Sequence, residues 1–436
     1  MPPIALDRPH AAQTSNSVPS DKISDASYWW QTSGRDLSRM LEEAEYPEPV
    51  RKQFLDFYRT VLCPQLGTKP QPDSKVACMS WDGTPFEYSF ELRGSTKKQK
   101  VRFSIDLTQL RPTDPEFPLN INSTQTVVNI LAKRTPGFDD SWYRSIKSSF
   151  VHSHLSSADQ HALVAKTGYY TQVGLGFDIA SKAAADDSLP VLGKVYFPPC
   201  FAAALQGITR WDAVQNAIRA LPGIDQVPNI IKSMELIDDF VTTNSDEYRH
   251  GPRFLATDFV SPDKSRLKVY FRQPFQDFES IWNFYTLGGR IPGLDEDKEM
   301  VRDLFAMAGN TTGQVQTGDE SKPHYTTVAR KMTAIYFSLS PNNPLPAPKI
   351  LFYPKNIADN DEVITRGVDQ WLHKYNWYDG GKSMEQRTQD VFTHRRLSER
   401  TGICSFMGIG RKEDPTKRDL SLQFYVTPEL YTTPRF

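Results

Sequence analysis

Five pairs of short β-patterned runs, each separated from the next by helical stretches, constrain the fold of this chain most strongly. Apolar and polar residues alternate along the runs, which is typical of strands with one buried face. The first link between paired runs, RGSTKKQ, is polar and contains glycine, as hairpin loops do. The predicted strands occupy residues 85–92 and 100–107, 169–179 and 192–197, 253–260 and 265–272, 331–340 and 348–354, and 402–410 and 420–426.

Helical spacing of apolar residues fills the stretches around these pairs. It predicts helices within residues 35–60, 125–165, 210–241, 276–286, 294–308 and 359–375. The unit recurs about every eighty residues, although no sequence repeat is visible. Ten antiparallel strands must bury their edges, and closure into a barrel does so. We therefore predict an α+β fold, a ten-stranded antiparallel β-barrel with a solvent-filled lumen, ringed by α-helices in repeated ααββ units.

The expected domain organisation is a flexible N-terminal tail, residues 1–27, followed by a single barrel domain, residues 28–436. The tail has no basic region followed by an apolar core, so we do not interpret it as a secretory signal. A set of separate α+β domains is the alternative. No linker rich in Gly, Ser or Pro divides the middle of the chain, which argues against it.

The charge balance limits the classes of partner. The chain has 51 basic and 52 acidic residues, which argues against nucleic acid or an anionic membrane as the main partner. No apolar run reaches the length of a membrane span. Four widely spaced cysteines are typical of a reducing compartment: Cys63, Cys78, Cys200 and Cys404. We expect a soluble, cytoplasmic protein that is a monomer or homodimer.

If helices cover the outside of the barrel, the polar face of each strand points inward. Three strands from different hairpins then bring cations into the lumen: Arg102 in KVRFSIDL, Lys194 in LGKVYF, and Arg266 and Lys268 in SRLKVYFR. Tyr196 and Tyr270 each follow a lysine by two residues and share its face. A single cation on a strand is more often a solvated surface charge, but recurrence on three strands favours a common site.

Clustered cations in a low-dielectric interior need an anion, and a diphosphate suits both Arg and Lys. Tyrosine ring faces attract cations. A diphosphate and a carbocation arise together when an allylic diphosphate ionises, so the pattern predicts a site for that step. Glu87, in WDGTPFEYSF, either is an ordinary strand-edge glutamate or accepts a hydrogen bond from the N–H or O–H of an aromatic acceptor.

The segments TPFE, VRFSID, GKVYF and SRLKVYFR, with YWW at residues 28–30 and PELY near the end, resemble the motifs of fungal aromatic prenyltransferases of the dimethylallyltryptophan synthase family. The resemblance runs from about residue 28 to the end of the chain. It implies the barrel predicted above. It also implies metal-independent transfer of a dimethylallyl or longer prenyl group from an allylic diphosphate to an indole-type acceptor in secondary metabolism. Dimethylallyl diphosphate would be the substrate, with no cofactor required.

The resemblance also implies roles for individual residues. Glu87 matches the glutamate that contacts the indole N–H, and Arg253 lies where tryptophan-using members hold the amino-acid carboxylate. Arg102, Lys194, Arg266 and Lys268 match the diphosphate-binding cations. Tyr196 and Tyr270 match two tyrosines that shield the allyl cation, and Tyr353 and Tyr425 are expected to complete the shield.

One departure from the family pattern concerns the acceptor. Gly174 stands where the family often has a basic residue, which argues against free tryptophan as the acceptor. Two alternatives therefore stay open: prenylation of a phenolic, polyketide or tyrosine-type acceptor, and a non-catalytic barrel that carries a ligand.

A run of acidic residues, LDEDKEMV at 294–301, has the spacing of a metal–diphosphate motif. We interpret it as the start of a helix, because acidic residues there complement the helix dipole, and we expect no metal site.

Overall fold

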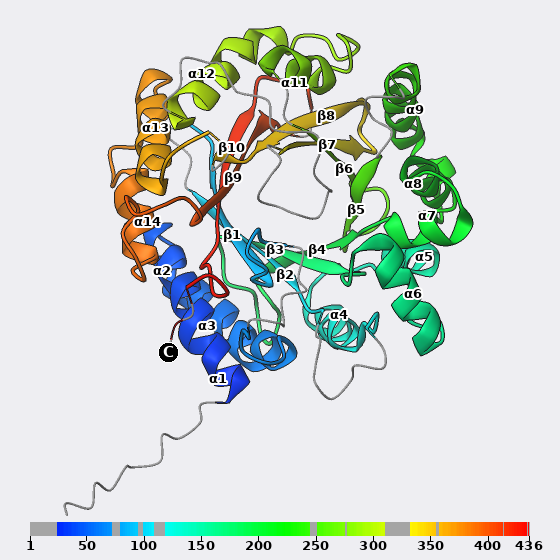
Figure 1. The fold of residues 1–436 in the computed structure, drawn as a ribbon, viewed down its shortest axis with the longest axis horizontal. Helices are drawn as coiled ribbons and strands as arrows, with labels where there is room; N and C mark the ends of the chain where they lie inside the picture. Colours follow the sequence, from blue (N-terminus) through cyan, green and yellow to red (C-terminus); the bar gives the residue numbers. More distant parts are fainter. Residues whose placement is uncertain are drawn as a thin grey trace, which may run out of the picture.

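Ten antiparallel strands close into one barrel (Figure 1). Their order around the barrel is β1-β10-β9-β8-β7-β6-β5-β4-β3-β2, so each strand pairs with its sequence neighbours and β1 closes onto β10. The strands are β1 (Phe86–Leu92), β2 (Lys100–Asp106), β3 (Gly174–Ile179), β4 (Val191–Phe197), β5 (Pro252–Asp258), β6 (Leu267–Pro274), β7 (Met332–Ser340), β8 (Asn343–Phe352), β9 (Cys404–Arg411) and β10 (Leu420–Val426). The predicted ten-stranded barrel is confirmed.

This computed structural model describes residues 24–71, 79–94, 99–108, 118–244, 251–274, 277–309, 332–354, 357–412, 414–433 and 435. Within these ranges the helices lie outside the barrel (Figure 1). They are α1 (Asp25–Trp29), α2 (Arg35–Glu43), α3 (Glu48–Phe57), α4 (Asn122–Arg134), α5 (Ser141–Phe150), α6 (Ser157–Thr167), α7 (Cys200–Gln206), α8 (Arg210–Arg219), α9 (Pro228–Thr243), α11 (Phe278–Tyr285), α12 (Lys298–Gly309), α13 (Asp361–Lys374) and α14 (Met384–Val391). Short π-helical turns follow α1 (Trp30–Gly34) and α3 (Tyr58–Leu62), and 3-10 turns span Cys63–Gln65, Ile224–Gln226 and Asp295–Asp297.

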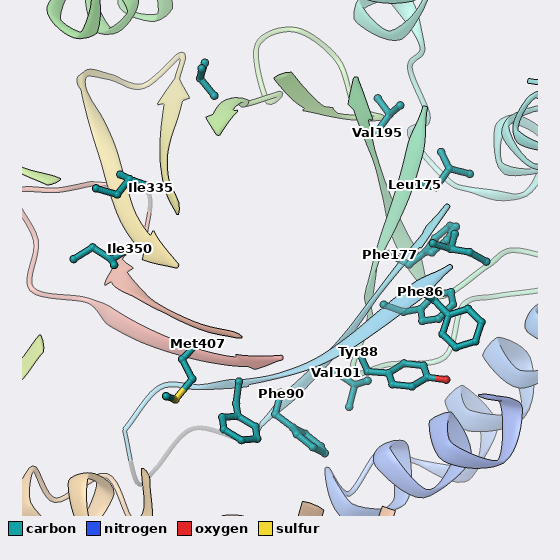
Figure 2. Close-up of a cluster of buried hydrophobic side chains, with 14 of the residues drawn as sticks. Phe86, Tyr88, Phe90, Val101, Leu175, Phe177, Val195, Ile335, Ile350 and Met407 are labelled. Carbon is teal, nitrogen blue, oxygen red and sulfur yellow. The ribbon is translucent and has the colours of Figure 1, made fainter. Parts of the chain in front are cut away.

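The main apolar core lies between the barrel and its helices. Strand β1 is buried along its whole length, yet its two faces differ in chemistry. Figure 2 shows Phe86 and Tyr88 pointing away from the barrel interior and toward the N-terminal helices. There the ring of Phe86 meets Trp29 edge-on, with centroids 5.9 Å apart. Because successive side chains of a strand alternate, the polar residues between these aromatics face the lumen.

The N-terminal boundary differs from the expected one. Helix α1 begins at Asp25, inside the segment predicted to be a flexible tail, because Ser24 caps it by accepting a hydrogen bond from the backbone N–H of Ser27. The Asp25 carboxylate also accepts a hydrogen bond, 3.0 Å long, from the backbone N–H of Lys69. Residues 1–23 lie outside the described residues, and the division into tail and single domain stays a prediction.

Two strands differ in extent from the predicted ones. Strand β3 begins at Gly174 rather than residue 169, because side chains of the preceding segment bond elsewhere: Thr171 to Asp106 and Gln172 to the backbone of Leu119. Strand β8 begins earlier than predicted, at Asn343, because a tight turn pairs this residue with Ser340.

Salt bridges tie the C-terminal segment to the barrel end at which β9 begins. The buried Arg395 joins the carboxylates of Asp361 and Glu429, at 2.5 and 2.7 Å. Asp361 also accepts hydrogen bonds from three consecutive backbone N–H groups, those of residues 402–404. Since every partner is buried and paired, this network holds the start of β9 against α13.

None of the helices that the structure describes combines the length and the apolar character that a bilayer crossing requires. The cytoplasmic location and the state as a monomer or homodimer stay predictions.

Gly367 gives a test of the packing between α12 and α13. A Cβ atom on Gly367 would lie 2.0 Å from the carbonyl oxygen of Met307, so Gly367→Ala must push the two helices apart. In an exposed helix the same change stabilises by about 1 kcal/mol, whereas here we expect a loss of about 1–3 kcal/mol in the free energy of unfolding, measured in urea. Gln370→Ala, at an exposed position of α13, is the control. A Gly367→Ala protein as stable as the wild type would contradict this packing.

Candidate functional site

A polar cavity lies inside the barrel and brings together seven of the ten predicted site residues. Its lining residues come from seven strands: Glu87, Ser89, Arg102, Phe103, Ser104, Phe177, Asp178, Lys194, Tyr196, Lys268, Tyr270, Tyr336, Gln423 and Tyr425. Three predicted residues, Arg253, Arg266 and Tyr353, are outside this set and are placed below.

Cations and tyrosines occupy neighbouring levels of the lumen. On β4, Lys194 pairs in register with Asp258 and Tyr196 with Ala256. On β6, Lys268 pairs with Ser338 and Tyr270 with Tyr336. Since each tyrosine lies two residues beyond its lysine on the same strand face, it sits one step further along the lumen.

The tyrosine level is a cluster of rings. The ring centroid of Tyr270 lies 4.8 Å from that of Tyr336 and 6.0 Å from that of Tyr196. Tyr425 lies on β10, and its hydroxyl donates to the side-chain oxygen of Gln423, at 3.2 Å. These four tyrosines all line the cavity, so their ring faces and edges border one shared space.

Tyr336 was missed by the sequence prediction, and Tyr353 lies elsewhere than expected. No lysine precedes Tyr336 on its strand, so the Lys-x-Tyr pattern does not find it, although alternation along β7 points it inward. Tyr353 comes after the last residue of β8. Its ring lies edge-on to Phe406, with centroids 5.3 Å apart, and Phe406 in turn contacts Tyr425. The shielding role of Tyr353 stays a prediction.

Three of the four predicted cations have carboxylate partners within the protein. Asp178 lies 3.1 Å from Arg102 and 2.5 Å from Lys194. Glu91 pairs with Arg102, at 2.9 Å, and Asp258 pairs with Arg266, also at 2.9 Å. The expectation that a diphosphate balances the clustered cations is therefore wrong for these three, because register across strands places acidic residues beside them, and this register is not visible in a single strand's sequence. Their binding of diphosphate stays a prediction.

Lys268 differs from the other cations. Among the described residues it forms no ion pair with a carboxylate, and its ammonium nitrogen lies 5.5 Å from the ring centroid of Tyr336. The side chain is 9% exposed. Burial, together with the neighbouring Lys194 and Arg266, holds the pKa of Lys268 well below its ordinary value.

Lys349, on β8, is another buried lysine. Unlike Lys268, it was missed by the sequence prediction. It is 3% exposed and pairs in register with Tyr336. Its ammonium nitrogen donates to the hydroxyl of Ser421, at 2.6 Å. Burial lowers the pKa of Lys349 to about 7, although Glu91 opposes the shift. A search restricted to Lys-x-Tyr misses this residue because leucine, Leu351, stands two positions later.

Along the lumen, Glu87 lies on the side of the tyrosine level that faces away from the cations. It is two residues from Ser89, which pairs with Tyr425 across β1 and β10. One carboxylate oxygen, Oε1, is buried and has no hydrogen-bond partner within the described residues. Burial raises the pKa of Glu87 well above its ordinary value, and Arg253 and Ser405 offset part of this rise. An unpartnered buried acceptor is costly unless a ligand's donor reaches it.

Arg253 and Gly174 shape the same end of the lumen as Glu87. Arg253 sits at a β-bulge between Pro252 and Phe254, and its guanidinium lies 5.3 Å from the ring centroid of Phe254. Gly174 pairs with Tyr196. A Cβ atom on Gly174 would come 2.3 Å from the terminal methyl carbon of Met79, so Met79 fills the space that a larger residue would take.

The described residues contain no group of three or more His, Cys, Asp or Glu side chains arranged to hold a metal ion. The acidic run at 294–301 has other contacts. Asp295 accepts a hydrogen bond from the indole N–H of Trp282, at 3.0 Å, and Asp297 is buried between Arg411 and Arg418, at 2.7 and 3.0 Å.

Comparison with known proteins places the chain among relatives of one kind. Residues 25–387 match the family model described as tryptophan dimethylallyltransferase. Prenyltransferase phnF of Penicillium herquei is 52% identical over 98% of this chain and 96% of the relative. DMATS-type prenyltransferase mfmD of Annulohypoxylon moriforme is 51% identical over 94% of each chain. The crystal structure of NotF in complex with brevianamide F and DMSPP matches with a TM-score of 0.75, at 21% identity, over 95% of this chain and 97% of that one, which shows the shared fold.

Binding of an anion in the lumen should take up protons. The pKa values of Lys268 and Lys349 are lowered, so both lysines lose charge as the pH rises through these lowered values, and an anion raises the values again by stabilising the charged form. Calorimetric titration with inorganic diphosphate near pH 7, in two buffers of different ionisation enthalpy, should show net proton uptake, and affinity should fall as the pH rises further. Lys349→Met should reduce the uptake, whereas Lys382→Met, at a surface lysine, should not. A binding enthalpy that is independent of the buffer would contradict this prediction.

Proposed function

The chain belongs to the tryptophan dimethylallyltransferase family and is an aromatic prenyltransferase, and on this premise we propose that it transfers a dimethylallyl group from dimethylallyl diphosphate to an aromatic acceptor without a metal ion. The observation that carries the proposal is the adjacency, inside one closed barrel, of a level of cations, a level of tyrosine rings and a buried carboxyl group. The non-catalytic ligand carrier does not fit membership of a family of transferases.

The cations bind the leaving group. Arg102, Lys194 and Lys268 border the cavity, and Arg266 lies beside them through Asp258. As the C–O bond of the allylic diphosphate breaks, its electron pair goes to the diphosphate oxygen. The cations are already in position, so stabilising this charge requires little reorganisation.

The tyrosines protect the carbocation. The allyl cation forms one step along the lumen from the diphosphate, next to Tyr196, Tyr270, Tyr336 and Tyr425. Their rings supply negative potential to the cation, and their bulk keeps water away. Burial raises the pKa of Tyr196 to about 12, and burial together with the other tyrosines raises the pKa values of Tyr270 and Tyr425 well above the ordinary value, so these phenols stay protonated and are poor nucleophiles.

Glu87 orients the acceptor. Its unpartnered Oε1 accepts a hydrogen bond from the acceptor's N–H or O–H, which raises the electron density of the ring. The ring attacks the allyl cation, a new C–C or heteroatom–C bond forms, and the proton released from the acceptor passes to Glu87. The raised pKa of Glu87 makes its ionised form a stronger base than an exposed glutamate.

The acceptor of first choice is an indole-type ring, and a phenolic, polyketide or tyrosine-type ring is the second. Glu87 serves an N–H or an O–H equally well. The second choice is favoured by Gly174 and Met79, which leave no basic side chain where one is expected for a tryptophan acceptor. Arg253, whose charge offsets part of the rise in the pKa of Glu87, stays the predicted partner of an anionic substituent on an acceptor of either class.

Mass spectrometry tests the reaction directly. We expect incubation with dimethylallyl diphosphate and a panel of indoles and phenols to give products heavier by one dimethylallyl group, at a rate unchanged by EDTA. Geranyl and farnesyl diphosphates in the same panel test the prenyl chain length. Turnover that is lost on chelation and restored by magnesium would refute the metal-independent reaction. Failure of every acceptor in the panel to gain the mass of a prenyl group would refute the function.

Glu87→Gln tests the role of the carboxyl group. The variant keeps the shape of the side chain but loses the base, so we expect kcat to fall by about 10²–10⁴-fold, with little change in the KM for dimethylallyl diphosphate. Glu48→Gln, at an exposed position in the first turn of α3, is the control. A Glu87→Gln enzyme with wild-type kcat would show that Glu87 takes no part in the reaction.

A further inference from the structure

Asp178 is a charged residue of the lumen to which the reaction above gives no part. It lies on β3, between the two strands that carry Arg102 and Lys194. Arg102 is its direct cross-strand neighbour, and Lys194 pairs in register with Gly176, two residues away. Each carboxylate oxygen of Asp178 contacts a different cation, Oδ1 with Arg102 and Oδ2 with Lys194. One carboxylate thus bridges two of the cations that are proposed to bind the diphosphate.

Asp178 is ionised throughout the neutral pH range. Burial alone would raise its pKa, but Arg102 and Lys194 outweigh burial and hold the pKa of Asp178 well below its ordinary value. The residue also lines the cavity itself, so its negative charge faces the space that the diphosphate would enter. Asp258, on β5, two strands away from β3, likewise pairs with a cation, Arg266.

Such a carboxylate has two opposite effects on the site. In the free protein it offsets cations whose burial without an anion would be costly, and it fixes the positions of their side chains. In the complex it lies close to a bound anion of the same sign and competes for the same nitrogen donors, so it weakens the binding of that anion. A site with cations alone would bind diphosphate more tightly and release it more slowly.

We propose that Asp178 is an internal counter-ion. It holds Arg102 and Lys194 in position when no ligand is bound, and it speeds release of the diphosphate product. The inference rests on the proposed function, because it assigns the bridged cations to the leaving group. Asp178 is a positioning residue in this role: it acts through Arg102 and Lys194 and forms no bond to the reacting carbon atoms. Asp258 acts in the same way through Arg266.

The sign of one measurement separates this role from a purely structural one. Asp178→Asn keeps the size of the side chain and removes its charge. We expect the Kd for inorganic diphosphate, measured by calorimetry, to fall at least about tenfold. If Asp178 served only to order the two cations, the same variant would bind diphosphate more weakly.

Kinetics supply a second readout. In the Asp178→Asn enzyme we expect diphosphate to inhibit more strongly, and we expect steady-state kcat to fall by a larger factor than the rate of a single turnover. Asp178→Glu, which restores the charge, should recover kcat and the weaker diphosphate binding. Asp239→Asn is the matched control, because Asp239 pairs with Arg290 on the surface, at 2.7 Å.

The proposal can be tested even if one of the variants fails to fold. Thermal unfolding with and without diphosphate should show a larger stabilisation for Asp178→Asn than for the wild type. If Asp178→Asn does not fold, Asp258→Asn is measured in its place, and the same tightening of diphosphate binding is expected.

The possible failures are distinguishable. A wild-type protein that binds no diphosphate would overturn the proposed leaving-group site and this inference with it. A wild-type protein that binds diphosphate, together with charge-removing variants that bind it equally or more weakly, would overturn the inference alone.

Discussion

The packing of the barrel's apolar outer face against its helices determines the chemistry of the interior. The hydrophobic side chains of β1 that make this contact are Phe86, Tyr88 and Phe90 (Figure 2). Strands β2, β3 and β4 contribute Val101, Phe177 and Val195 in the same way (Figure 2). Because side chains alternate along a strand, the polar half of every strand must then face the lumen. The interior is therefore lined by charged and phenolic side chains as a consequence of how the outside is buried, and the helices contribute to the site by covering the other face of its walls.

A charged interior is stable only when its charges are matched, and this requirement connects the fold with the proposed reaction. Asp178, Asp258 and Glu91 compensate Arg102, Lys194 and Arg266, so the cations are held in fixed positions before any ligand arrives. Preorganised charges stabilise a leaving group well, because they need not move as the bond breaks. The matching is incomplete at Lys268 and Lys349, and burial, together with neighbouring cations, lowers the pKa values of both lysines. An anionic ligand therefore finds a site that is ordered but still short of negative charge.

The features that the sequence predicts are those that repeat along one strand. Alternation identifies the ten strands and the lumen faces of Arg102, Lys194 and Lys268, and the two-residue offset identifies Tyr196 and Tyr270. The features that the sequence did not predict depend on which residues pair across neighbouring strands. Tyr336 pairs with Tyr270 of β6 on one side and with Lys349 of β8 on the other. Asp178 and Asp258 join the site through the cations of adjacent strands. Tyr353 follows the last residue of β8 and is not among the residues that line the cavity.

Glycines, which have no side chain, shape the lumen as much as the larger residues do. Two glycine pairs, in GLG of β3 and GIG of β9, fit no nucleotide-binding motif, and the structure gives them a spatial role. A Cβ atom on Gly176 would come 3.0 Å from the ring of Tyr196, and one on Gly408 would come 2.7 Å from the side chain of Leu351. At Gly410 the nearest atom would be the backbone oxygen of Pro348, at 2.4 Å. Side chains at these positions would displace Tyr196 from the ring cluster and force β8 away from β9. The proximity of the rings to the cations therefore depends on strands that contribute backbone alone at these levels.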